Sequence, residues 1–168
     1  MSLIYGDNFI GNNTISAEQT FPALFSGNNK LVNAKDLILP SMSLTTDCYN
    51  FIFRSCTSLV TAPELPATTL ALRCYLGMFR SCTSLVTAPE LPATYLANYC
   101  YHYMFYNCTS LNYIKAMFTS TQNNYSTTAN NWLYNVAATG TFVKNSEATW
   151  DNSEWGIPTG WTVETASE

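Results

Sequence analysis

Apolar and polar residues in the middle of the chain repeat with a period of 26 residues. The segments 53–78 and 79–104 carry the same residue at 21 of 26 positions, and their first 16 positions match without a break. A third copy begins at Phe105 and degenerates after Leu111, while a weaker copy opens at Phe25. A fixed period of roughly 20–50 residues is typical of repeat proteins, in which one copy alone cannot bury its apolar face. We therefore expect coils that stack, with residues one period apart lying on top of each other.

Within each copy the pattern predicts one helix and one short strand. Apolar residues at spacings of one, three and four predict a helix over 68–80. Thr68 is placed to cap its first turn, and Arg80 lies near its end, where a positive charge suits free carbonyls. Residues 59–62 predict a strand that ends at Pro63, because proline lacks the N–H that a ladder needs. Strands of successive coils would pair in parallel, with helices on the other wall and right-handed crossovers.

The five positions that differ between the two copies lie at offsets that share one face of a helix. In residues 79–104, the differences introduce three tyrosines and a histidine. One interpretation is drift on an exposed surface between duplicated copies. The other is a face adapted for contact, to which Tyr106 of the next copy would add. The candidate binding face consists of Tyr95, Tyr99, His102, Tyr103 and Tyr106.

Six cysteines form two columns at the repeat period. The columns are Cys48, Cys74 and Cys100, and Cys56, Cys82 and Cys108. Each cysteine takes an equivalent place on the expected core side, where a free thiol behaves as a small apolar group, so we favour buried thiols over disulfides. A zinc site is not expected, because no pair has C-x2-C spacing and the one histidine lies on the variable face.

The pattern divides the chain into three regions. Residues 1–24 are expected to cap the first coil, 25–118 to form the repeats, and 119–168 to form a tryptophan-rich C-terminal cap. Elements outside the duplicated copies are also predicted: strands within 36–40, 112–114, 139–144 and 157–163, one helical turn at 132–136, and a polar loop at 120–131. The four tryptophans are expected to seal the last coil, with an aromatic platform for sugar rings as the alternative.

Composition excludes several classes of function. Only 11% of residues are charged and the net charge is −4, so no basic patch supports nucleic-acid binding. No apolar run reaches the roughly 18–20 residues that a membrane span needs, and Asp7 and Asn8 interrupt any signal peptide. No catalytic motif or cofactor-binding loop is present, so an enzyme is not expected. Glu64 and Glu90 are equivalent acids on successive coils, and simple solvation is favoured over paired acid–base chemistry.

The repeat resembles a known family. Residues 78–85 (MFRSCTSL) and 88–94 (APELPAT), with 140–145 (GTFVKN) and 157–163 (IPTGWTV), look like the repeats and the ending of BspA-like leucine-rich repeat proteins of bacteria. The resemblance implies an α/β fold: a short right-handed leucine-rich-repeat solenoid with parallel strands on one wall, short helices on the other, and a cap at each end. It also implies display at a bacterial cell surface and a role in adhesion. Similar repeats occur in phage-encoded proteins, which leaves a virion-associated location as the alternative.

These observations predict a non-enzymatic binding or adhesion module that presents one face to a protein or a glycan, outside the cell or at its surface. The alternative is a structural subunit of a larger assembly, such as a virion or a multi-domain surface protein, that packs through its terminal caps. No cofactor, metal or nucleic acid is expected.

Overall fold

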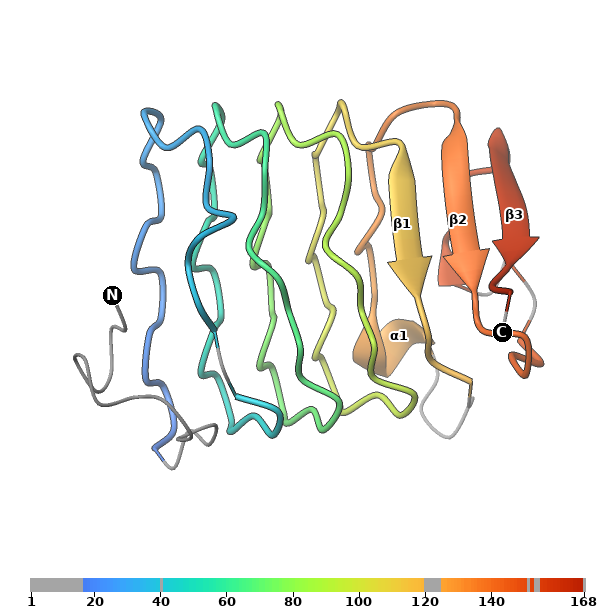
Figure 1. Cartoon of the computed structure of the whole chain (residues 1–168), viewed down its shortest axis with the longest axis horizontal. Coiled ribbons are helices and arrows are strands. Elements are labelled where there is room, and N and C mark those ends of the chain that lie inside the picture. Colours follow the sequence, from blue (N-terminus) through green and yellow to red (C-terminus); the bar gives the residue numbers. More distant parts are fainter. Residues whose placement is uncertain (1–16, 40, 120–124, 151, 153–154, 168) are drawn as a thin grey trace.

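The structure is a computed structural model that describes residues 17–39, 41–119, 125–150, 152 and 155–167. Its coils lie side by side as a stack that runs from the first described residues to the C-terminal strands (Figure 1). The regular elements lie toward the C-terminal end: β1 (Tyr113–Ala116), α1 (Tyr125–Thr128), β2 (Gly140–Lys144) and β3 (Trp161–Thr165). The three strands form one parallel sheet in the order β1-β2-β3. Residues 1–16 of the expected N-terminal cap and residues 120–124 of the expected polar loop lie outside the described residues.

Residues one period apart lie on top of each other, as the repeat predicted. The rings of Phe53 and Phe79 stack with centroids 5.4 Å apart and planes 3° from parallel, and Phe105 continues the column at 5.6 Å and 2°. Phe25 begins this column, 5.6 Å from Phe53. A second column of stacked rings runs through Phe21, Tyr49, Tyr75, Tyr101 and Trp132. Both columns fill the interior between the two walls of the stack.

The expected helix over 68–80 is wrong, and with it the helix-bearing leucine-rich-repeat solenoid of the α/β class. This segment is a run of turns in which every fourth residue is left-handed, with φ of 54° at Arg73, 55° at Gly77 and 63° at Ser81. A right-handed helix cannot contain such residues. Within the described residues, α1 is the one α-helix and has four residues. The predicted capping role of Thr68 and the predicted helix-end role of Arg80 are therefore also wrong, because this helix is absent.

Main-chain hydrogen bonds between coils replace the helix. The N–H of Gly77 donates to the carbonyl of His102 and that of Phe79 to the carbonyl of Met104, each at 2.9 Å. The intervening amide of Met78 closes a local turn with the carbonyl of Tyr75 at 3.1 Å. Alternate amides therefore join the next coil, whereas every amide in a helix interior bonds within the helix. We call this surface, made of residues 45–56, 71–82 and 97–108, the turn wall.

The opposite wall is parallel, as expected, but it has less strand than predicted. Residues 59–62 do not form a strand, and Thr61 makes an isolated parallel bridge to Asn33. The predicted strand within 36–40 is likewise absent from its described residues. Prolines that follow each short segment explain the interruption, since they cannot donate to a ladder. Continuous strands appear at 113–116, 140–144 and 161–165, close to the three strands predicted there.

The six cysteines are buried and free, which confirms the buried-thiol interpretation. Three of their thiols also carry a specific contact. Cys82 Sγ donates to the carbonyl of Phe53 and Cys108 Sγ to that of Phe79, each at 3.0 Å, and Cys56 repeats the contact with Phe25. A thiol is small enough for this column and still satisfies a buried carbonyl.

The tryptophans seal the C-terminal end of the stack. Trp132, Trp150, Trp155 and Trp161 are at most 6% exposed, which rules out the sugar-stacking platform. Three indole N–H groups donate to main-chain carbonyls: Trp132 to Trp155 at 2.7 Å, Trp150 to Phe118 at 3.1 Å, and Trp161 to Ala137 at 2.8 Å. The helical turn predicted at 132–136 is wrong, because this segment continues the non-helical turns of the wall.

Replacing Phe79 with alanine should lower the free energy of unfolding by about 3–5 kcal/mol, because it opens a cavity in the middle of a continuous ring column. Chemical denaturation measures the loss. Val86→Ala in the same coil is the matched control, since Val86 is 42% exposed and its truncation should have an effect of about 0.5 kcal/mol. A loss below about 1 kcal/mol for Phe79→Ala would contradict the column.

Stability should fall in alkaline solution because of the buried thiols. Burial raises the pKa of Cys48 to about 11 and the pKa values of Cys100 and Cys108 to about 12, against about 9 for an unburied thiol. Between pH 9 and 11 the unfolded chain loses thiol protons that the folded protein retains. The free energy of unfolding then decreases by up to about 1.4 kcal/mol per pH unit for each thiol.

Urea unfolding of the wild type and of Cys100→Ala at pH 8, 9, 10 and 10.5 tests this dependence. The buried tyrosines contribute to it in the same direction, because burial also raises the pKa values of Tyr75 and Tyr101. The variant should therefore show a shallower slope rather than a flat line. Identical slopes for the two proteins would count against a thiol contribution.

Candidate functional site

Four of the five predicted contact residues come together on the turn wall. The rings of Tyr99 and His102 meet edge to face with centroids 5.4 Å apart, His102 and Tyr103 at 4.3 Å, and Tyr103 and Tyr106 at 5.5 Å. Tyr99 is 40% exposed, and the other three are half-buried. Tyr95 is the most exposed of the five at 64%, but among the described residues it makes no ring contact with the others.

Two further residues belong to this group, although the comparison of repeat copies does not point to them. Tyr134, in the following coil, stacks on Tyr106 with centroids 5.0 Å apart and is 57% exposed. The guanidinium of Arg80 lies over two rings, 5.3 Å from the centroid of Tyr103 and 5.0 Å from that of Tyr106. The aromatic row, as we use the term below, consists of Tyr99, His102, Tyr103, Tyr106 and Tyr134 with Arg80.

A signal for Tyr134 exists in the sequence. The pair Tyr106-Asn107 recurs as Tyr134-Asn135, and the two asparagines share a left-handed conformation and a side-chain hydrogen bond of 2.6 Å. The copy was hidden because its spacing is 28 residues rather than 26. The predicted helix would place Arg80 at its end. In the absence of a helix, its charge instead meets the electron-rich faces of tyrosine rings.

His102 is half-buried rather than fully exposed. Burial lowers its pKa, which favours the neutral imidazole at pH 7. Its Nδ1 is buried and makes no hydrogen bond within the described part of the chain. Tyr99 and Tyr103 pack against its ring, which makes His102 the centre of this group of contacts.

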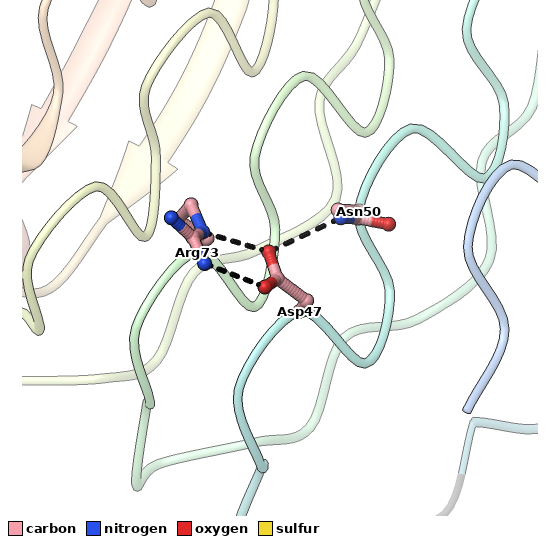
Figure 2. Close-up of polar contacts among 3 residues, drawn as sticks. All are labelled: Asp47, Asn50 and Arg73. Atoms are coloured by element: carbon pink, nitrogen blue, oxygen red, sulfur yellow. Dashed lines mark hydrogen bonds and ion pairs between the residues drawn. The ribbon is translucent and has the colours of Figure 1, made fainter. Parts of the chain in front are cut away.

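An ion pair joins two coils on the same wall (Figure 2). The carboxylate of Asp47, which is only 5% exposed, accepts two bonds of 2.9 Å from Nε and Nη2 of Arg73. Asn50 donates a third bond of 3.1 Å to the same carboxylate. Figure 2 shows the guanidinium and the amide approaching Asp47 from two coils. Arg73 stands one period before Tyr99, so the wall changes at this position from an ionic to an aromatic surface.

The two acids considered for paired chemistry lie on the opposite wall. Glu64 and Glu90 are exposed, and the Glu90 carboxylate forms an ion pair with Lys115 at 3.0 Å. These contacts agree with solvated carboxylates. Across the described residues, no group of three or more histidine, cysteine or acidic side chains is arranged to hold a metal ion. No helix in the described ranges is long and apolar enough to span a membrane.

Comparisons with protein-family models, with curated proteins and with solved structures found no match. The resemblance to BspA-like repeats therefore rests on the sequence motifs alone.

Arg73→Ala should lower the urea midpoint, because it leaves the buried Asp47 carboxylate with the amide of Asn50 and no cation. Arg73→Lys should fall between this variant and the wild type, since lysine keeps the charge but loses the two-bond geometry. Leu72→Ala, on the exposed neighbouring residue, is the control and should change little. If Arg73→Ala and Leu72→Ala have equal midpoints, the ion pair does not stabilise the fold.

Proposed function

We propose that this protein is a non-enzymatic binding module whose aromatic row contacts a protein or a glycan. The observation that carries the proposal is the continuity of the row: Tyr99, His102, Tyr103 and Tyr106 of one coil touch in sequence, and Tyr134 of the following coil extends the row along the outer wall. This chain of ring contacts supports a contact surface over drift between duplicated copies. Three residues of the row, Tyr99, His102 and Tyr103, also stand at positions where residues 79–104 differ from residues 53–78.

The physical properties of the row suit recognition. Tyrosine offers a large contact area with few rotatable bonds, and it is enriched among residues that dominate binding energy. Ring–ring contacts and Arg80 hold the side chains before any ligand arrives. Less side-chain entropy is then lost on binding, which favours affinity. The cationic guanidinium beside the rings adds a donor for a carboxylate, a carbonyl or a sugar hydroxyl.

A glycan array and a cross-linking pull-down test the proposal and separate the two ligand classes. For any ligand found, Tyr99→Ala and Tyr103→Ala should each weaken binding by about 10- to 30-fold, as expected for central contact residues. Tyr113→Ala is the matched control, because Tyr113 is 37% exposed but lies in β1, outside the row. If both row variants bind every detected ligand as the wild type does, the row is not the contact surface.

A structural role in a larger assembly is the second candidate, and one observation favours it. β3 pairs with β2 along one edge, and no strand in the described part of the chain pairs with its other edge. An open strand edge can accept a strand from another chain. Sedimentation at increasing concentration would detect self-assembly, and a monomer throughout would count against association with itself. A bacterial surface or a virion stays the expected setting for either role.

A further inference from the structure

A second surface lies on the wall opposite the aromatic row. Two arms of identical sequence, residues 60–66 and 86–92, border an open groove of about 710 Å³. Its border includes exposed apolar side chains, with Val60 at 48% and Val86 at 42%, and it contains Pro63 and Pro89. We call this surface the arm groove. It shares no residue with the aromatic row, so it requires a separate explanation.

The groove coincides with an open seam in the main chain. The first arm is bonded to the preceding coil, since Val60 N–H donates to the carbonyl of Val32 at 2.8 Å. The second arm is bonded to the following coil, where Ala88 N–H donates to the carbonyl of Tyr113 at 3.0 Å. Between the two arms, whose residues are all described, no main-chain hydrogen bond is found. Residues 53–78 and 79–104 are instead joined by main-chain bonds across the turn wall.

The seam leaves polar main-chain groups without partners. Ala62 and Thr87 line the groove, and the N–H and C=O of each make no hydrogen bond with any described residue. Such groups are the usual anchor for an extended peptide, whose own backbone supplies matching donors and acceptors. A lipid chain cannot satisfy them. The arms cannot close the seam as a full ladder, because Pro63 and Pro89 lack an N–H.

The charges at the groove indicate which side chains a bound peptide would carry. Glu90 is already paired with Lys115 at 3.0 Å, whereas Glu64 is exposed and has no ion pair among the described residues. The groove therefore offers one unpaired carboxylate beside two exposed valines. A lysine or arginine flanked by apolar side chains complements this arrangement in both charge and hydrophobicity.

From these features we infer that the arm groove binds an extended peptide segment carrying a lysine or arginine between apolar residues. The peptide backbone bonds to Ala62 and Thr87, its cation pairs with Glu64, and its apolar side chains pack on Val60 and Val86. This site is independent of the aromatic row, so either can fail without the other.

Synthetic peptides test the site directly. The probes are capped six-residue peptides of alternating valine and threonine with one central lysine, glutamine or glutamate. Titration into the ¹⁵N-labelled protein should shift the amide signals of Ala62 and Thr87, with the lysine peptide binding at least about 10-fold more tightly than the glutamate peptide. Glu64→Gln should remove this preference and leave binding of the glutamine peptide unchanged.

Two control variants make the result specific. Glu147→Gln removes the same charge from an exposed residue outside the groove and should keep the preference for lysine. Tyr99→Ala should bind all three peptides as the wild type does, which separates this site from the aromatic row.

Four outcomes would overturn the proposal. The first is no binding of any peptide at 1 mM, a concentration of about the weakest affinity expected for a specific contact. The second is an equal effect of Glu64→Gln and Glu147→Gln. The third is that a neutral oligosaccharide, and no peptide, shifts Ala62 and Thr87. The fourth is that these signals depend on protein concentration alone, which would assign the groove to a second copy of the chain.

Discussion

The structure depends on main-chain hydrogen bonds that cross from one coil to the next along the turn wall. They are possible because every fourth residue is left-handed, which turns alternate amides toward the neighbouring coil. The positions recur in each coil, as at Phe51, Gly77 and Tyr103. Each non-glycine residue in this conformation costs roughly 1–2 kcal/mol, so the wall persists only because stacking and hydrogen bonding outweigh that strain. The ring columns and the buried thiols lie directly behind this wall.

The left-handed positions of the turn wall also explain how individual side chains pack at Gly77 and Tyr103. A side chain at Gly77 would collide with the ring of Phe51, which packs there from the preceding coil. Where the next coil has Tyr103 instead, its ring turns outward and joins Arg80 and Tyr106. Two rings of the candidate binding row, Tyr99 and Tyr103, thus stand at left-handed positions of the wall.

The sequence predicted the stacking and its columns, because a 26-residue period with cysteine and phenylalanine at fixed places has few other solutions. It failed at the helix for a physical reason. The apolar pairs 70–71, 74–75 and 78–79 repeat every four residues, which imitates a period of 3.6 over so short a stretch. Left-handed residues are usually signalled by glycine or asparagine, and Arg73 and Ser81 give no such signal. Tyr99, His102 and Tyr103 could be found by comparing copies, whereas Arg80 is identical in both copies and could not. The open seam could not be predicted from the sequence either, because the two arms that border it are identical.

The central claim is that amides of one coil bond to carbonyls of the next rather than to their own segment. Scalar couplings measured across hydrogen bonds by NMR report the partner of each amide directly. The account predicts a coupling between the nitrogen of Phe79 and the carbonyl carbon of Met104, which lies one coil further on. A coupling from Phe79 to the carbonyl carbon of Tyr75, four residues earlier, would show a helix and contradict it.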